Sequence, residues 1–208
     1  MTKINLGCGP GGVDGWTNYD WGLLPLVNKF PLILKIFVKL GWIDSSYIIK
    51  WPNFELFDIR NNFAEKDKSV DFVYCSQVLE HFERWEALEI SKEVYRILKK
   101  TGVYRVSVPD AKLLYKKYLK NKNADVLAKD IWGFEKNVKP QSFMRRISRW
   151  FIRDHQWLYD FDSMKVLLNE AGFKNVNEVN YRTGTTPDLN ILDLEDHKPT
   201  SMYIEARK

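Results

Sequence analysis

Four short apolar segments in the first part of this 208-residue chain each end on a glycine, an acid or a serine. They are KINLG (3–7), WTNYD (16–20), FELFD (54–58) and VDFVYCS (70–76). Later strand-like segments alternate with amphipathic ones, which is typical of a parallel sheet covered by helices. In such a sheet the ligand lies outside the carboxyl ends of the strands. The residues at those ends are therefore the first candidates for a functional site.

Two segments follow the spacing of an amphipathic helix. The first covers residues 84–102, with two lysines in the expected last turn and Gly102 as the stop signal. The second covers residues 162–173, with Asp162 as the expected N-cap and Gly172 near its C-terminal end. Both helices follow a predicted strand or loop, as an alternating α/β chain requires.

Three further segments predict strands, at residues 103–109, 174–181 and 200–208. No helical pattern separates the last two, so we expect them to pair antiparallel. The sequence therefore predicts a mainly parallel sheet with helices on both faces and an antiparallel ending.

The glycines after the first strand raise the question of a nucleotide ligand. Gly7, Gly9 and Gly12 have the spacing of a dinucleotide-binding turn, but Pro10 and its glycine neighbours argue against the helix that would face a diphosphate. Asp20 follows Gly7 by 13 residues, whereas the dinucleotide motif has an acid about 20 residues on. A dinucleotide site, another nucleotide-like site and a glycine turn without a ligand all stay open. We therefore expect the first crossover, which is the connection between the first two predicted strands, to be a loop and not a helix.

Two acids at neighbouring strand ends suit a ligand with an adenosine half. Asp20 ends the second strand, where a carboxylate can accept hydrogen bonds from ribose hydroxyls. Asp58 ends the third strand, where it could face an adenine amino group or hold a turn.

Composition restricts the compartment and the kinds of site. The two cysteines, Cys8 and Cys75, lie in no metal-ligand spacing, which argues against a disulfide framework or a structural zinc site. We expect free thiols in a reducing, cytoplasmic compartment and no metal. The first residues run directly into a strand, so we also expect no signal peptide.

Residues 21–43 form an apolar insertion that three lysines and two prolines interrupt. A membrane-spanning helix needs about 20 mostly apolar residues, so this segment is not expected to span a bilayer. Its apolar residues Ile33, Ile36, Phe37 and Leu40 follow helical spacing. Such a basic amphipathic helix either packs on its own protein, which we favour, or lies on a membrane surface.

Positive charge is concentrated in one part of the chain, whose formal net charge is +5. Residues 112–153 contain 12 Lys or Arg and 3 Asp or Glu. This block indicates either an anionic partner or a solvated helical face. Within it, Arg145 and Arg146 lie in a helical pattern, and arginine binds phosphate or carboxylate through a planar fork. We expect these two to lie on a lid that recognises an anionic substrate.

Several motifs, taken in order, resemble those of class I S-adenosylmethionine-dependent methyltransferases, and most of all the small type-11-like proteins. The motifs are LGCGP, GWTNYD, SVDFVYCSQVLEHF, VYRILKKTGVYRVSVPD and YDFDSMKVLLNEAGFKNV. The resemblance implies a Rossmann-like, doubly wound, seven-stranded sheet, mostly parallel with an antiparallel last strand. It also implies a single domain over residues 1–208, with insertions at about 21–50 and 112–155 that form a cap.

The resemblance also implies S-adenosylmethionine as the cofactor and assigns residues to it. The first crossover is shorter than usual, which removes part of the wall around the methionine carboxylate, and the 21–43 insertion could restore it. The implied contacts are Gly7, Cys8 and Gly9 for the methionine part, Asp20 for the ribose, Asp58 and Ile59 for the adenine, and Ser76 and Gln77 near the sulfonium.

Methyl transfer from a sulfonium is an in-line displacement, so the protein mainly aligns the two reactants. A general base is needed only for a hydroxyl or a protonated amine. The candidates are His81 and His155, each with a purely structural alternative. Glu80 either contacts the substrate or interacts with the N-terminus of the following helix. Asp110 could orient the substrate at the end of its strand.

The leading hypothesis is a methyltransferase acting on a small-molecule or glycan acceptor, and the basic block favours an anionic one. The basic charge also fits RNA methylation, but CSQVLEH differs from the D/N-P-P-Y motif of amino-methylating nucleic-acid enzymes and no separate RNA-binding module is recognisable. We therefore do not expect a nucleic-acid partner. Two further hypotheses are a cofactor-binding scaffold without catalysis and an NAD enzyme, and the missing helix argues against NAD.

Overall fold

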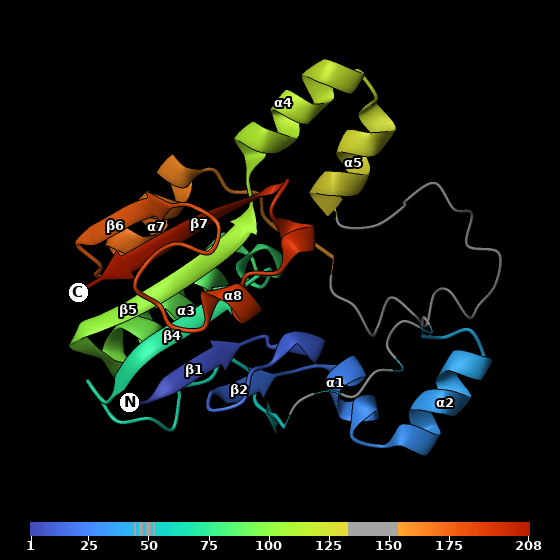
Figure 1. Ribbon diagram of the computed structural model, residues 1–208, viewed down its shortest axis with the longest axis horizontal. Coiled ribbons are helices and arrows are strands. Elements are labelled where there is room, and N and C mark those ends of the chain that lie inside the picture. Colours follow the sequence, from blue (N-terminus) through green and yellow to red (C-terminus); the bar gives the residue numbers. More distant parts are fainter. Residues whose placement is uncertain (44, 46–47, 49–50, 52, 133–153) are drawn as a thin grey trace.

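The computed structural model describes residues 1–43, 45, 48, 51, 53–132 and 154–208. Within these residues, seven strands form one sheet in the order β3-β2-β1-β4-β5-β7-β6 (Figure 1). Strands β1 to β5 pair in parallel, and β7 runs antiparallel to both β5 and β6. The expected fold class is thereby confirmed. The strands are β1 (Lys3–Leu6), β2 (Thr17–Asp20), β3 (Glu55–Leu56), β4 (Val70–Ser76), β5 (Leu98–Pro109), β6 (Asn175–Val179) and β7 (Ser201–Arg207).

The helices are distributed unevenly around this sheet. Figure 1 shows α3 and α7 behind the sheet and the short α8 in front of it. The α1–α2 and α4–α5 pairs extend from the end of the sheet where the parallel strands finish. The helices are α1 (Leu23–Asn28), α2 (Pro31–Lys39), α3 (Arg84–Ile97), α4 (Ala111–Asn121), α5 (Ala124–Trp132), α7 (Phe161–Glu170) and α8 (Leu189–Leu192), with short 3-10 turns η1 (Gly9–Gly11), η3 (Leu79–His81) and η4 (Glu195–His197).

Strand β4 shows how both faces of the sheet are buried. Its side chains alternate, as strand geometry requires. Val73 and Cys75 belong to the large core under α3 and α7. Tyr74 belongs to a smaller core with Leu189 and Leu192 of α8. A short helix therefore covers the face on which a longer crossover helix is missing.

The first crossover is a loop, as the sequence predicted. Between β1 and β2 only the three-residue turn η1 forms. The buried Asn18 side chain holds the rest of this loop: Oδ1 accepts a hydrogen bond from Val13 N at 3.2 Å, and Nδ2 donates to Val13 O at 3.1 Å and Trp16 O at 3.3 Å. One side-chain amide thus satisfies backbone groups that a helix would otherwise pair internally.

The helix expected over residues 84–102 ends earlier than predicted. Leu98 is already extended, and α3 finishes at Ile97. Lys99, Lys100 and Gly102 therefore lie in β5 and not in a last helical turn. The reason is the pairing of Leu98 with Val70 of β4, a contact that helix propensity does not report.

The next predicted helix begins earlier than expected, because the N-cap of α7 is Asp160 and not Asp162. Asp160 Oδ1 accepts a hydrogen bond from Ser163 N at 2.9 Å, and Ser163 Oγ accepts one from Asp160 N at 3.0 Å. This reciprocal arrangement is a capping box with serine at its second position. Asp162 lies inside the first turn and pairs with Lys112 at 3.0 Å.

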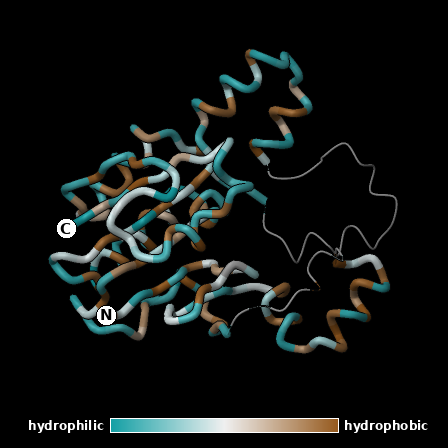
Figure 2. The backbone as a smooth tube through the Cα atoms, in the orientation of Figure 1, coloured by the Kyte–Doolittle hydropathy of each residue, from teal (hydrophilic) through white to brown (hydrophobic). Residues whose placement is uncertain are grey.

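Of the four apolar residues that the spacing of the insertion after β2 suggested, Phe37 packs, partly buried, against the core that contains Leu34. Leu34 of α2 is buried with residues of α1 and with Trp51. Ile33, Ile36 and Leu40, by contrast, are exposed by 41%, 56% and 43%. Figure 2 shows the alternation of hydrophobic and hydrophilic colour along α2. None of the helices in the described residues combines the length and apolar character that crossing a bilayer takes.

The connection between β6 and β7, which was expected to lack a helix, contains α8 and η4. It is tied to the middle of the sheet by Arg105 of β5. Arg105 Nη2 lies 2.5 Å from Asp193 Oδ2, and both side chains have no exposed area. Arg105 Nη1 also donates to Thr183 O at 2.6 Å. Asp193 accepts further hydrogen bonds from Tyr74 Oη at 3.1 Å and Arg182 N at 2.9 Å.

Replacing Asp193 by alanine should lower the free energy of unfolding by about 3–5 kcal/mol, because it removes the nearer carboxylate from the buried Arg105 guanidinium and leaves only Glu205 Oε1, at 3.8 Å from Nη1, as a weaker partner. The matched control is Glu170→Ala, which breaks a 2.9 Å pair with Arg84 whose side chains are 35% and 43% exposed. That change should cost less than about 1 kcal/mol. Urea unfolding followed by circular dichroism measures both, and equal losses would contradict the structural role of the buried pair.

Candidate functional site

A cavity of about 630 Å³ opens at the carboxyl ends of β1, β2 and β4. This volume lies within the range of small-molecule sites, about 300–1,000 Å³. Most of the residues that the sequence singled out line it together. These are Gly7, Cys8, Gly9, Asp20, Asp58, Ile59, Ser76, Gln77 and His81.

The turn after β1 brings backbone, and not side chains, to the cavity. Gly7 and Gly9 have φ angles of +61° and +49°, a region that glycine enters without strain. A Cβ on Gly7 would lie 2.3 Å from Cγ2 of Val78, so the turn packs directly on the segment after β4. A Cβ on Gly9 would meet nothing within 4 Å, so the backbone there borders open space.

Asp20 connects this turn to the end of β2. Its Oδ2 accepts a hydrogen bond from Gly9 N at 2.6 Å, and its Oδ1 accepts one from Trp21 N at 2.7 Å. Burial raises the pKa of Asp20, and the two backbone donors oppose that shift. The Cys8 thiol is a third, weak donor, at 3.9 Å from Oδ2, and a carboxylate offers about four acceptor positions, so one remains for a ligand in the cavity.

Cys8 lies between the two glycines, and its side chain is buried. Its Sγ lies 3.9 Å from Asp20 Oδ2. Burial, and then the neighbouring Asp20 charge, raises the pKa of the Cys8 thiol to about 12. The thiol is therefore protonated at neutral pH.

Asp58 is held by an arginine that the sequence analysis did not mark. Arg60 Nε lies 2.9 Å from Asp58 Oδ1, and Arg60 Nη2 lies 2.6 Å from Asp58 Oδ2. Arg60 lines the cavity, as Asp58 does, and Ile59 between them is buried in the main core. The Asp-x-Arg spacing after a strand was the available signal for this pair.

The segment after β4 is fixed to the neighbouring strands. Gln77 has a φ of +55°, which is uncommon for a residue with a side chain. Gln77 N donates to Ser107 O of β5 at 2.8 Å, and Gln77 Nε2 donates to Ser201 Oγ of β7 at 3.0 Å. The side-chain amide of Gln77 is thus engaged with the sheet, while Ser76 lies beside it at the cavity wall.

Two segments without any recognised motif supply the remaining cavity wall. The insertion contributes Trp21 and Leu24 among others, and the β6–β7 connection contributes Leu192, Leu194 and His197. His197 was not among the residues that the sequence analysis singled out. It is half-buried here, and burial lowers its pKa.

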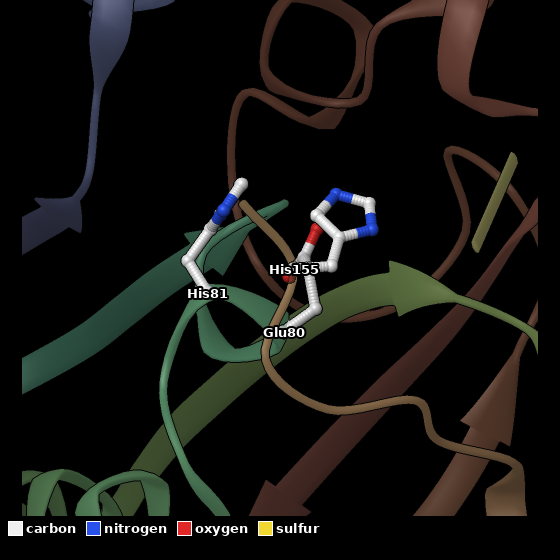
Figure 3. A group of neighbouring side chains, drawn as sticks. All are labelled: Glu80, His81 and His155. Carbon is white, nitrogen blue, oxygen red and sulfur yellow. The ribbon is translucent and has the colours of Figure 1, made fainter. Parts of the chain in front are cut away.

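Glu80, His81 and His155 converge beside this cavity (Figure 3). Glu80 and His81 belong to η3, and the segment that carries His155 is bound to η3 through its backbone. Gln156 N and Trp157 N both donate to Glu80 O, at 2.7 and 3.1 Å. The imidazole rings of His81 and His155 are edge to face, with their centroids 4.8 Å apart.

Glu80 does not cap the helix that follows it. Helix α3 is capped by Glu83, whose backbone N donates to Glu86 Oε2 at 3.0 Å in a capping box. Glu80 is 1% exposed, and neither of its carboxylate oxygens has a hydrogen-bond partner among the described residues. Burial raises its pKa to about 8. The interpretation of Glu80 as a helix cap is therefore wrong.

His155 is half-buried, and its Nδ1 lies 2.8 Å from Ile131 O. A carbonyl can only accept, so Nδ1 carries the proton and Nε2 is left as the basic nitrogen. Burial lowers the pKa of His155, which favours the neutral ring at neutral pH.

One predicted substrate residue, Asp110, does not line the cavity that the described residues form. Asp110 caps α4, with Oδ1 accepting a hydrogen bond from Lys112 N at 2.8 Å. Arg145 and Arg146 lie outside the described residues.

Known proteins resemble this chain in domain family and in fold. A family model described as a methyltransferase domain matches residues 2–178. No curated protein matches the chain in sequence.

Solved structures match over the whole chain at low sequence identity. A SAM-dependent methyltransferase from Archaeoglobus fulgidus is 16% identical with a TM-score of 0.52, over 100% of this chain and 86% of that one. One from Methanosarcina mazei is 13% identical with a TM-score of 0.53, over 100% and 92%. A structure of a Haloferax volcanii methyltransferase in complex with the Trm112 activator is 12% identical with a TM-score of 0.52, over 99% and 81%. These similarities show the shared fold.

Gly7→Ala should lower the free energy of unfolding more than Gly9→Ala does. Both changes place a Cβ at positive φ, which costs about 1–2 kcal/mol, but only the first meets Val78. Urea unfolding of both variants and of Gly7→Ala/Val78→Ala separates the two effects. Gly7→Ala should cost less free energy of unfolding in the Val78→Ala background than in the unmodified chain, because the side chain that it meets has been shortened. Equal losses for Gly7→Ala and Gly9→Ala would contradict this packing.

Proposed function

Because the chain belongs to the methyltransferase domain family, we propose that it transfers a methyl group from S-adenosylmethionine to a small-molecule or glycan acceptor. The observation that carries this proposal is the cavity at the carboxyl ends of the strands. Residues 7–9 and Asp20 line it, at the position where α/β sheets bind their ligands.

The residues present fit this cofactor. The open space at Gly9 admits a ligand against the backbone, and one acceptor position of Asp20 remains for a ribose hydroxyl. Asp58 and Ile59 would lie at the adenine, and Ser76 nearer the sulfonium. When bound, the cofactor supplies an electrophilic methyl group and its own leaving group. The task left to this chain is to bind and align the two reactants.

We propose that the acceptor binds between the cavity and the two additional helix pairs. The α1–α2 pair supplies part of the cavity wall, and α4–α5 extends from the end of β5. We therefore treat residues 21–50 and 112–155 as a cap on a single domain. Exposed lysines on α4, including Lys116 and Lys120, support an anionic acceptor, although Lys117 is paired with Asp130 at 2.7 Å.

We propose a cytoplasmic location, which the two cysteines support because both are buried free thiols.

Isothermal titration should show micromolar binding of S-adenosylmethionine and S-adenosylhomocysteine, and no binding of NAD. Asp20→Asn should weaken both sulfur ligands by about 10–100-fold, because charge-assisted hydrogen bonds contribute about 1.5–3 kcal/mol each. The control is Asp162→Asn, an acid that is 77% exposed on α7 and should leave both affinities unchanged. Binding of NAD without either sulfur ligand would overturn the proposal.

We also propose that α2 touches an anionic membrane surface, because a specific set of side chains is exposed there. Leu32 and Ile36 are 77% and 56% exposed, and Lys29, Lys35 and Lys39 are exposed around them. Apolar side chains flanked by lysines are the composition of helices that lie in the interface of negatively charged bilayers.

The chain should co-sediment with vesicles that contain phosphatidylserine and not with pure phosphatidylcholine vesicles. Leu32→Ser/Ile36→Ser should reduce this binding by about 100-fold or more, since each of the two buried aliphatic side chains contributes about 1.5–3 kcal/mol. Val166→Ser, which changes a 51% exposed residue of α7, serves as the control. Equal binding by both variants would exclude α2 as the contact.

A further inference from the structure

We propose that Glu80, His81 and His155 bind one divalent transition-metal cation. Each of these residues offers one ligand atom, and the three atoms all lie within 4.8 Å of one another. Two imidazole nitrogens and one carboxylate oxygen form the donor set of catalytic zinc sites and of non-haem iron sites. The site therefore favours a cation such as Zn²⁺ over Mg²⁺, which prefers oxygen ligands alone.

Only a small rearrangement is needed to close the site. Ligand bonds of about 2.0–2.1 Å in a tetrahedral arrangement place ligand atoms about 3.3 Å apart. The three ligand atoms lie within 4.8 Å of one another, so they would have to approach by at most about 1.5 Å to reach this spacing. Their side chains point toward one another from two segments of the chain (Figure 3). The hydrogen bonds of Gln156 N and Trp157 N to Glu80 O hold these segments together.

The burial of Glu80 is the second and independent observation. A carboxyl group that is 1% exposed normally has hydrogen-bond partners, because burying it alone is costly. Within the described part of the chain, both oxygens of Glu80 lack one. A cation held between Glu80 and the two imidazoles would provide the missing partner.

The surroundings of His155 suit a metal ligand. Its Nδ1 faces the Ile131 carbonyl oxygen at 2.8 Å, which fixes the ring and leaves Nε2 for the cation. Metal-binding histidines commonly donate their second ring nitrogen to a carbonyl or carboxylate in this way. His81 lines the cofactor cavity, so the cation would lie at the cavity rim.

The role of the cation, unlike its binding, rests on the proposed methyltransferase function. Three protein ligands leave at least one position open, which an acceptor hydroxyl could fill. A cation there lowers the pKa of that hydroxyl, so its proton passes to solvent water. The acceptor oxygen then forms the new bond to the methyl carbon while the carbon–sulfur bond breaks and its electron pair stays on sulfur. His81 and His155 would thus act as metal ligands, in place of a general base.

The test is titration of the metal-free full-length chain with ZnCl₂ in a non-chelating buffer. We expect one Zn²⁺ per chain. The affinity for Zn²⁺ should fall by about 100-fold or more in each of the variants Glu80→Gln, His81→Asn and His155→Asn. This loss exceeds the roughly 10- to 100-fold that is typical when a residue that only hydrogen-bonds to a metal ligand is removed. His197→Asn is the matched control, because this third histidine is also half-buried at the cavity but lies outside the cluster. It should bind Zn²⁺ as the unmodified chain does.

Cobalt substitution gives a second readout that needs no activity. Co²⁺ bound by the three ligands should give visible absorption bands that disappear in each cluster variant and persist in His197→Asn. Absence of saturable Zn²⁺ binding, unchanged affinity in the folded cluster variants, or tighter binding of Mg²⁺ than of Zn²⁺ would overturn the proposal. Circular dichroism checks that each variant is folded, and the His81 and His155 variants decide the outcome if Glu80→Gln is not. Titration with S-adenosylmethionine in the same samples separates failure of the metal site from failure of the methyltransferase proposal.

Discussion

The buried pair between Arg105 and Asp193 is the interaction on which the shape of the site depends. It joins the middle of β5 to a connection that is distant in sequence, with both side chains excluded from solvent. A charge in such a position is tolerated only with a close counter-charge and further hydrogen bonds, and Thr183 O and Tyr74 Oη provide them. The connection is therefore fixed across one face of the sheet, where its leucines and His197 complete the cavity wall.

This arrangement compensates for a shortened first crossover. A doubly wound sheet normally receives long helices on both faces, but within the part of the chain that the structure describes one face is covered by the short α8 and the rest of the β6–β7 connection. The 3-10 turn and the Asn18 amide keep the crossover compact, so the glycine turn stays close to the strand ends. The insertion then adds Trp21 and Leu24 to the open side. Segments that look like additions to the fold are thus parts of its binding wall.

Features with a local cause could be predicted from the sequence. The ends of β1, β2 and β4 were placed correctly because apolar runs that end on Gly7, Asp20 and Ser76 carry their own signal. The end of α3 was misplaced because Leu98 pairs with Val70, a contact between distant segments. The role of Arg105 was missed for the same reason: its partner lies 88 residues away.

The residues of the candidate site also divide into those with a local signal in the sequence and those that depend on contacts between distant segments. The glycine turn and the strand-end acids were recognised, because their spacing is set by single turns of the chain. The convergence of Glu80 and His81 with His155 was not, because it depends on two backbone hydrogen bonds between η3 and residues 156–157. On α2, periodicity identified an apolar face, but only the packing of Leu34 shows which side is covered. A sequence pattern shows which face of a helix is apolar, but it does not show which other element packs on that face.

The position of Cys8 has a consequence for a protein that handles an electrophilic methyl donor. A thiolate in the glycine turn would be a nucleophile beside the sulfonium and would compete with the acceptor for the methyl group. Burial and the Asp20 carboxylate raise the pKa of this thiol to about 12, so almost no thiolate exists at neutral pH. Burial, assisted by the acid that we propose to hold the ribose, thereby disfavours alkylation of the chain by its own cofactor.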